Sequence, residues 1–283
     1  MVLPTMATPC LFVSDLHGSN RRYEALWRRV ADERPAAVFL GGDLLPGSAG
    51  LADSTAFIER WLEIPAAVCG AGSAIFLVPG NDDPARDFLE LCRGADRGLW
   101  TLLNGAERPV GRWRAFGYGY VPPTPFLLKD WERYDVSRFV DPGSVSPEEG
   151  QRTLAVDADD IRYGTIQKDL AELAGDTPQD DAVWLFHSPP YDTDLDRADL
   201  DGRMVDHVPL DVHVGSIAIR RFIEQRKPLV TLHGHVHESA RMTGAWRQQL
   251  GRTWMLSAAH DGPELALVRF DLEDLENATR ELV

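Results

Sequence analysis

Side chains that can bind metal ions follow five short apolar runs of the chain. In order, they are Asp15 with His17, Asp43, Asn81, His187, and His235 with His237. Imidazole nitrogens with carboxylate or amide oxygens, and no sulfur, suit divalent manganese, iron, zinc, cobalt or nickel. Seven such side chains exceed what one tetrahedral ion requires. They therefore suggest two cations, roughly 3.5–4 Å apart, that share a bridging carboxylate.

Two adjacent cations of this kind would serve hydrolysis by metal-activated water, and phosphate esters are among the substrates of such centres. We expect in-line attack on phosphorus by a metal-bridging hydroxide, because metal binding lowers the pKa of water towards about 7. The ions would also neutralise phosphate oxygens and hold the ester in line. The sequence contains no GxSxG motif and no Cys/His nucleophile motif that would favour a covalent mechanism. Gly42, Gly80 and Gly234 stand beside the candidate ligands, where they permit tight turns.

The elements that must position these side chains alternate between strands and helices. We predict strands at residues 10–14, 36–40, 74–78, 182–186 and 229–232, and helices at 21–33, 54–64, 163–174 and 216–225, with a further helix opened by Pro84. This order implies mainly parallel pairing with right-handed crossovers. The carboxyl ends of the strands then bring the polar groups to one edge. Residues 265–272 alternate in polarity and are expected to join a second sheet.

Residues 122–160 interrupt this rhythm. They contain five prolines and the aromatic residues Phe126, Trp131, Tyr134 and Phe139. A long irregular segment inside a compact domain is usually functional or poorly ordered, and its aromatic content favours a packed excursion. We therefore interpret residues 1–283 as one domain in which this excursion shapes the substrate pocket.

The ordered motifs resemble those of the calcineurin-like metallophosphoesterase superfamily. Its pattern is D-x-H, G-D, G-N-[HD], H and G-H-x-H, and this chain has DLH, GGD, GND, H and GHVH from Asp15 to His237. The segments 187–191 (HSPPY), 213–216 (HVGS) and 232–239 (LHGHVHES) further resemble a prokaryotic branch described as cyclic-nucleotide-phosphodiesterase-like.

The resemblance implies an α/β fold, a four-layer αββα sandwich with two central mixed sheets and outer helices. It also implies how the ligands divide between two divalent metal ions, with manganese the first expectation. One ion would take Asp15, His17 and His237, the other would take Asn81, His187 and His235, and Asp43 would bridge both.

The chain departs from the family pattern where a leaving-group acid is expected. Many members carry a histidine after the asparagine of the G-N motif, where this chain has Asp82. Free aspartate titrates near 3.9, and nearby cations lower its pKa further. We therefore expect Asp82 to orient a ligand or accept hydrogen bonds, and His213 and His260 are the alternative proton donors. His233 is either a residue that orients a ligand or a buried strand-end histidine.

The chain also departs from the family pattern in a segment that forms a wall of the site. Relatives often have an N-P-G-S segment after the last histidine motif, whereas residues 257–262 here read SAAHDG. The acidic run at residues 192–201 resembles a calcium loop but lacks the glycine at position six and the closing glutamate. We interpret that run as a solvated loop.

Charge and composition limit the partners. The net charge of −15 makes long nucleic acid a poor partner, so we expect a small phosphate ester. The three cysteines do not suggest a disulfide framework. Residues 1–17 lack a basic leader region, and no apolar run approaches the ~18 residues of a membrane helix. We expect a cytoplasmic protein without a membrane partner; its oligomeric state is not indicated.

Several functions stay open at this level. Monoesters, diesters, cyclic nucleotides and short oligonucleotides all fit two metals, and phosphodiesters are favoured. One alternative is a non-catalytic metal-binding scaffold of the same fold, although all seven ligand positions are filled. Another is a metal-dependent amide hydrolase, but such enzymes usually begin with HxH on a barrel strand and need eight regular βα units.

Overall fold

The computed structural model describes residues 7–47 and 54–283, so part of the N-terminal stretch interpreted above lies outside the described residues. Two six-stranded sheets form its centre, with the strand orders β14-β13-β1-β2-β3-β4 and β11-β12-β10-β7-β6-β5. The strands of the first sheet are β1 (Pro9–Val13), β2 (Ala37–Leu40), β3 (Ala74–Leu77), β4 (Thr101–Leu102), β13 (Ala266–Asp271) and β14 (Asp274–Leu282). Those of the second are β5 (Ala106–Val110), β6 (Trp113–Tyr118), β7 (Ala182–Phe186), β10 (Val230–His233), β11 (Arg247–Leu250) and β12 (Thr253–Ser257).

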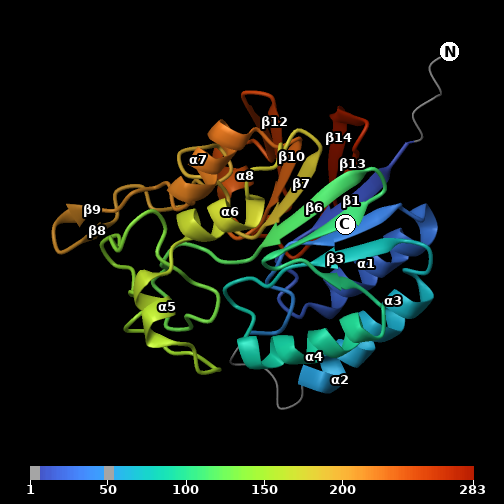
Figure 1. Ribbon diagram of the computed structural model, residues 1–283, viewed down its shortest axis with the longest axis horizontal. Helices are drawn as coiled ribbons and strands as arrows, with labels where there is room; N and C mark the ends of the chain where they lie inside the picture. The colour runs from blue at the N-terminus through green and yellow to red at the C-terminus, as the bar shows by residue number, and fades with distance from the viewer. Residues whose placement is uncertain (1–6, 48–53) are drawn as a thin grey trace.

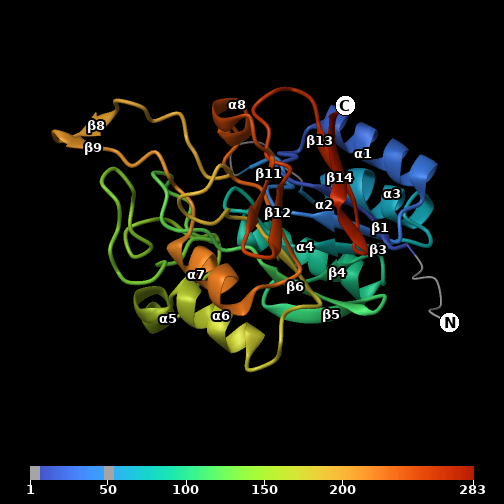
Figure 2. The same ribbon diagram turned by 90° about the horizontal axis from the view of Figure 1, so that it is seen from above.

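Both sheets are mixed. In the first, β1, β2 and β3 pair in parallel, while β13 runs antiparallel to β1. In the second, β10 is parallel to β7 and β12, while β11 and β5 are antiparallel edge strands. A separate small hairpin is made by β8 (Met204–Val205) and β9 (Val208–Pro209) and projects from the body of the molecule (Figures 1 and 2).

Helices lie outside the two sheets. They are α1 (Asn20–Glu33), α2 (Ser54–Ile58), the π-helix η1 (Glu59–Glu63), α3 (Ile64–Val68), α4 (Ala85–Asp96), α5 (Ala158–Tyr163), α6 (Ile166–Ala174), α7 (Ile217–Arg226) and α8 (Ser239–Thr243). Figure 1 shows α1 to α4 on the side of the first sheet, and α6 and α7 on the side of the second. None of the helices in the described part of the chain has the length and apolar character that crossing a membrane requires.

Three apolar cores show that the layers stack as helix, sheet, sheet and helix. Successive residues of a strand point to opposite faces, so Leu11 of β1 packs beneath α1 while Phe12 lies between the sheets. On the second sheet, Leu185 faces the shared core, whereas Trp184 faces α6 and α7. This arrangement confirms the predicted αββα sandwich with two mixed sheets.

One helix prediction is confirmed with a local irregularity, and another needs correction. The stretch 54–64 is helical but contains the π-helix η1, because Pro65 has no N–H for the carbonyl of Trp61. That carbonyl accepts a hydrogen bond from the Trp27 indole instead, at 2.7 Å. The stretch 163–174 is interrupted after α5, since Thr165 caps a new helix by accepting a hydrogen bond from the Lys168 amide.

The prediction that residues 265–272 join a second sheet is wrong. They form β13, which pairs with β1 in the first sheet. Both faces of β13 are buried, with Leu267 in the core beneath the helices and Val268 in the core between the sheets. Alternation in the sequence therefore could not show which sheet the strand joins.

Residues 122–160 form a packed excursion up to the start of α5. Isolated bridges pair Val121 with Glu132 and Leu128 with Gln151. Lys129 and Glu132 make a fully buried ion pair. Glu132 also accepts hydrogen bonds from the amide and hydroxyl of Thr124, at 2.7 and 2.6 Å, and Lys129 donates to the Thr124 carbonyl at 2.9 Å.

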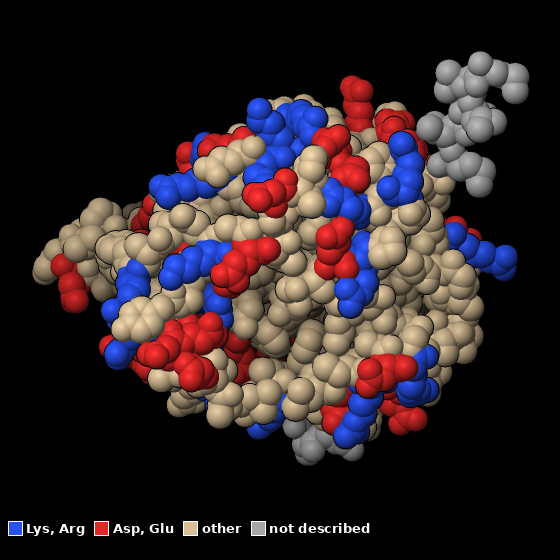
Figure 3. Space-filling model, in the orientation of Figure 1, with Lys and Arg blue, Asp and Glu red and all other residues tan. Residues whose placement is uncertain are grey.

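Acidic and basic side chains are interleaved over the face shown in Figure 3. Acidic side chains gather over α5, whose first turn carries Asp159 and Asp160. Arg133 pairs there with Asp160, at 2.6 Å. Mixed charges of this kind do not favour a polyanionic partner on this face.

The buried ion pair should stabilise the excursion. Replacing Lys129 by methionine leaves the Glu132 carboxylate buried without a cation, and we expect the free energy of unfolding to fall by about 3–5 kcal/mol. Urea unfolding followed by circular dichroism measures the loss. The double variant with Glu132→Leu removes both charges and should recover most of it. A Lys129→Met variant as stable as the wild type would show that the pair contributes nothing.

Candidate metal centre

Strands of both sheets bring the predicted ligands to one edge. The first sheet supplies Asp15 and His17 after β1, Asp43 after β2 and Asn81 after β3; the second supplies His187 directly after β7, and His235 with His237 after β10. Asp15, Asp43, Asn81 and His187 are buried, while His17 and His237 are about one-third exposed. The fold therefore brings the predicted ligand side chains together beyond the strand ends.

Four of these side chains form a tight cluster. Ligand atoms of Asp15, His17, Asp43 and His237 all lie within 4.8 Å of one another. The Nε2 atoms of His17 and His237 are 3.2 Å apart, and Asp15 Oδ1 lies 3.4 Å from His237 Nε2. Two imidazole nitrogens bound to one ion at about 2.0–2.1 Å would face each other at a similar separation. The donor set and its spacing thus fit a divalent cation.

The other predicted ligands meet the cluster at Asp43. His187 Nε2 lies 3.2 Å from Asn81 Oδ1 and 3.3 Å from Asp43 Oδ2. The rings of His187 and His235 are 5.1 Å apart. Because the same Asp43 oxygen lies 3.7 Å from His17 Nε2, this carboxylate stands between the two groups of ligands.

The electrostatics of the cluster favour bound positive charge. Burial alone would raise the pKa of the Asp15 and Asp43 carboxyls, but the surrounding histidines have a larger, opposite effect. His187 and His17 lower the pKa of Asp43 to about 2. His237 holds the pKa of Asp15 below its usual range. Burial likewise opposes protonation of His17 and His187, yet the nearby carboxylates raise their pKa to about 9. Divalent cations can take the place of these protons.

One histidine of the set behaves differently. Burial and the neighbouring charge of His187 lower the pKa of His235 to about 3. His235 is therefore neutral at physiological pH, which is the form that coordinates metals.

The backbone at the ligands is in an unusual conformation. Asp15, His17, Asp43 and His235 have φ angles of 57°, 45°, 51° and 72°, in the left-handed region that non-glycine residues rarely adopt. Such strain clusters at functional sites, where surrounding contacts hold it. Gly80 is required here for space, because a Cβ at this position would collide with the carboxylate of Asp43.

Further contacts fix the orientation of the ligands. His187 Nδ1 is 2.7 Å from the carbonyl of Gly41, which leaves Nε2 facing Asp43. His17 Nδ1 is 3.3 Å from Asp82 Oδ2, and the Asp82 amide donates to Asp43 Oδ1 at 2.8 Å. Contacts of this type set the tautomer and the aim of metal-binding histidines. Asp82 thus contacts both His17 and the carboxylate of Asp43.

Asp83 is a structural anchor that the sequence did not reveal. Its fully buried carboxylate accepts hydrogen bonds from the amides of Gly80, Leu44 and Leu45, at 3.0, 3.1 and 2.7 Å. It therefore ties the loop of Asp43 to the loop of Asn81. The only signal in the sequence is a third polar residue after the glycine, which by itself indicates no partner.

The two candidate proton donors lie in different surroundings. His213 Nδ1 is 2.8 Å from Asp196 Oδ1, and His213 lines the cavity that contains the predicted ligands. His260 instead faces Glu264, with its Nε2 at 3.2 Å from the carboxylate.

The interpretation of residues 192–201 as a solvated loop is wrong at Asp196. That carboxylate is fully buried and accepts hydrogen bonds from the amides of Asp192, Thr193 and Gly215. Hydrogen bonds from these amides offset the cost of burying the Asp196 charge. The acidic composition of the run could not indicate such contacts.

His233 is a buried strand-end residue. Its ring nitrogens lie 2.9 Å from the Ser188 carbonyl and 2.7 Å from the Thr231 hydroxyl, and the ring stacks on Phe186. Burial lowers the pKa of His233 to about 4. These contacts satisfy the side chain within β10 and its neighbours.

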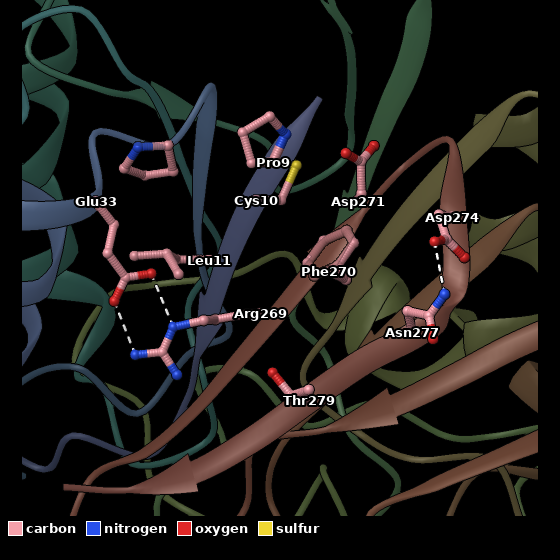
Figure 4. Close-up of a pocket in the computed structure, with 11 residues that line it drawn as sticks. Pro9, Cys10, Leu11, Glu33, Arg269, Phe270, Asp271, Asp274, Asn277 and Thr279 are labelled. Atoms are coloured by element: carbon pink, nitrogen blue, oxygen red, sulfur yellow. Dashed lines mark hydrogen bonds and ion pairs between the residues drawn. The ribbon is translucent and has the colours of Figure 1, made fainter. Parts of the chain in front are cut away.

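A large cavity opens beside the cluster. It has a volume of about 800 Å³, and its lining includes His17, Asp43, Asn81, His235 and His237. A smaller cavity of about 260 Å³ lies at the opposite end of β1, beside Pro9 and Cys10 (Figure 4). Its polar wall is occupied by an ion pair between Arg269 and Glu33, at 2.7 and 2.8 Å. The larger cavity is therefore the one that adjoins the candidate ligands.

Comparison with known proteins agrees with this fold. Residues 8–239 match the family model described as calcineurin-like phosphoesterase. One crystal structure is 17% identical, covers 98% of this chain and 99% of its own, and has a TM-score of 0.60. The protein TT1561 of Thermus thermophilus is 20% identical, with coverage of 98% and 99% and a TM-score of 0.58. The search of curated proteins found no match.

Asp83 provides a test of how the two ligand loops are held. We expect Asp83→Ala to lower the free energy of unfolding by at least about 3 kcal/mol, because three buried amides lose their acceptor. Metal retention should fall about 10–100-fold, as for other residues that support ligands. Calorimetry and metal analysis measure the two effects. Asp96→Ala, at an exposed carboxylate at the end of α4, is the control and should change neither. Normal metal retention in Asp83→Ala would refute the anchoring role.

Proposed function

The chain belongs to the calcineurin-like phosphoesterase family, and from this premise we propose that it is a metal-dependent hydrolase of phosphate esters that prefers diesters. The observation that carries the proposal is the cluster of Asp15, His17, Asp43 and His237 beside a cavity large enough for an ester. Family membership supports phosphoesterase chemistry, and the preference for diesters is our own inference.

We propose that two cations share this centre. One would be held by Asp15, His17 and His237, the other by Asn81, His187 and His235, and Asp43 would serve both. The contacts of Asp43 Oδ2 with His17 and His187 support this division. When bound, the cations would act as Lewis acids that neutralise phosphate oxygens and lower the pKa of water. Manganese is the first metal to test, since oxygen and imidazole ligands suit it.

The chain's own groups would orient the reactants. Asp82 would hold His17 through Nδ1, and the Gly41 carbonyl would hold His187 in the same way. Preorganised groups of this kind contribute to catalysis because they need not rearrange as charge develops.

Charge in the cavity supports a diester. Phosphate monoesters carry about −1.5 to −2 at neutral pH, whereas a diester carries a single negative charge. The wall of the cavity includes Asp82 and Glu238, and Arg203 is the single lysine or arginine among the described residues that line it. The second negative charge of a monoester would therefore be poorly compensated away from the cations.

Of the candidate proton donors, we propose His213. Asp196 accepts three backbone hydrogen bonds, so it is held as an acceptor and His213 Nδ1 must donate to it. His213 Nε2 is then the atom that can exchange a proton with the leaving group. Asp82 would act as a positioning residue for His17.

We also propose a cytoplasmic, single-domain protein. The cysteines Cys10, Cys69 and Cys92 are free, which fits a reducing compartment. The core between the sheets is shared by strands from both halves of the chain, which supports one folding unit.

Asp43 is the residue on which the two-metal proposal depends most. Asp43→Asn keeps the shape of the side chain but removes its charge, so the fold should persist. We expect kcat/KM to fall at least about 100-fold and metal content to decrease. Activity on bis(nitrophenyl) phosphate, metal analysis and circular dichroism measure the three effects. Asp32→Asn, at an exposed position on α1, is the control. A folded Asp43→Asn protein with normal turnover would exclude the shared role.

Removing the metals gives a second test of the proposal. Chelation should abolish turnover of the wild type, and adding manganese should restore it. Turnover that survives complete chelation would contradict a metal-dependent reaction.

The dependence of kcat/KM on leaving-group pKa tests the proton donor. General acids contribute about 10²–10⁴-fold, and most with poor leaving groups. We expect a shallow dependence in the wild type that steepens in His213→Ala and stays shallow in His260→Ala. Asp82→Asn should lower metal retention without changing the slope. An unchanged slope in His213→Ala would remove His213 from the mechanism.

A further inference from the structure

We propose that the large cavity binds the organic group of the substrate, and that this group is apolar and carries no negative charge. The inference rests on the proposed function and deepens it by naming the substrate class. Its basis is the size of the cavity, the chemistry of its wall and the way two segments of the chain close over it.

The cavity extends well beyond the candidate ligands. Small-molecule sites usually have volumes of about 300–1,000 Å³, and this one has about 800 Å³. A phosphate group beside His17 and Asp43 would fill only a small part of that space. The remainder is available to the group esterified to the phosphate.

The wall of that remaining space is largely apolar. The excursion contributes Pro122, Phe126 and Phe139, and the segment that carries the β8–β9 hairpin contributes Val205, Leu210 and Val214. Phe126 and Phe139 are 63% and 70% exposed. Exposed apolar surface around a concave site marks a place where a ligand or partner binds, and aromatic rings offer the largest area for such contact.

The charged residues of the wall disfavour a second anionic group. Besides the candidate ligands, the carboxylates that line the cavity are Asp82, Asp135, Asp141, Asp211 and Glu238. Asp135 is occupied at the start of α7, where it accepts hydrogen bonds from Ser216 and Ile217. Asp211 accepts a hydrogen bond from the hydroxyl of Tyr191. A carboxylate or second phosphate on the substrate would meet these groups, with Arg203 as the single lysine or arginine among the described lining residues.

The two segments meet at Gly143 of the excursion. A Cβ placed on Gly143 would lie 3.2 Å from Val205 Cγ2 and 3.9 Å from Leu210 Cδ2, so the hairpin segment packs closely there. Figures 1 and 2 both show the β8–β9 hairpin beside this part of the chain. Because neither segment belongs to the two sheets, this part of the cavity is built by elements other than the strands that position the candidate ligands.

The hairpin offers a matched pair of variants. Val205 pairs with Val208 across the hairpin, but only Val205 is among the residues that line the cavity. Val208 is 47% exposed. Val205→Asp should therefore place a charge in the wall, while Val208→Asp should place the same charge on the same hairpin outside it.

A binding experiment tests the cavity without catalysis. The probe is N-phenyl-1-naphthylamine, an uncharged apolar fluorophore, added to the full-length protein with and without manganese. We expect saturable binding to the wild type and to Val208→Asp, and about tenfold weaker binding to Val205→Asp, because an apolar ligand would leave the new carboxylate poorly solvated. Absence of saturable binding, or equal weakening by both variants, would overturn the inference.

A substrate series tests the same site in turnover. Diesters with one nitrophenyl leaving group and a methyl, hexyl, naphthyl or carboxyhexyl second group keep the chemistry constant. We expect kcat/KM for the hexyl and naphthyl esters to exceed that of the methyl ester about tenfold, and the carboxyhexyl ester to lose this gain. Leu210→Arg should raise the relative kcat/KM of the carboxyhexyl ester. Equal values across the series, or a preference for the carboxylate in the wild type, would overturn the inference.

The two experiments separate this inference from the proposed function. If the probe binds as expected but no ester is hydrolysed with any metal, the proposed function fails while the apolar site stands. If esters are hydrolysed without discrimination and the probe does not bind, the phosphoesterase stands and the apolar site fails.

Discussion

Buried negative charge is the constraint on which this structure depends. The carboxylates of Asp15 and Asp43 are 1% and 3% exposed, and each lies within hydrogen-bonding or ion-pairing reach of histidines rather than of lysine or arginine. Buried carboxylates are costly unless they are paired, hydrogen-bonded or bound to metal. Histidines can offer a proton or a coordinating nitrogen, so they allow the same carboxylates to be neutralised by protons or by divalent cations. A lysine or arginine in their place would neutralise the charge permanently and leave no role for a metal.

The two-sheet architecture follows from the need to assemble these groups from distant parts of the chain. The first sheet supplies the aspartates and the second supplies His187 and His235. Their meeting depends on the apolar core between the sheets, where Phe12, Phe39, Leu185 and similar side chains set how the strand ends align. Close packing makes such a core resistant to small shifts. The apolar contacts between the sheets therefore set the relative positions of the polar side chains at the strand ends.

The sequence predicts the parts of the protein that repeat a simple pattern. Apolar runs followed by ligand-type residues identified the strand ends, and the helix predicted at residues 21–33 is α1, whose buried residues Tyr23, Leu26, Trp27 and Val30 recur at helical spacing. Other parts depend on remote contacts that no local pattern records. Asp83 and Asp196 look like surface residues in the sequence, yet both are buried and accept hydrogen bonds from amides of other loops, those of Leu44, Leu45 and Gly215.

Some of the strands that the sequence did not predict have a similar explanation. β11 (Arg247–Leu250) and β14 (Asp274–Leu282) are polar edge strands, so they lack the apolar run that marked the central strands. The β8–β9 hairpin turns at Asp206 and His207, which adopt positive φ without the glycine that usually signals such a turn.

If the proposed substrate class is right, the division between the sheets and the cavity wall would explain how such a centre selects it. The ligands stand at the ends of strands within two packed sheets, where movement would break both the core and the strained loops. The excursion and the hairpin segment lie outside those sheets, and the excursion has its own stabilising contacts, such as the buried pair of Lys129 and Glu132. Changes in the wall can therefore alter which organic group fits without moving Asp43 or its neighbours. The excursion is also packed against the scaffold, as the hydrogen bond from the Trp131 indole to the Asp83 carbonyl shows. Binding of the organic group could therefore help to position the phosphate beside the candidate ligands.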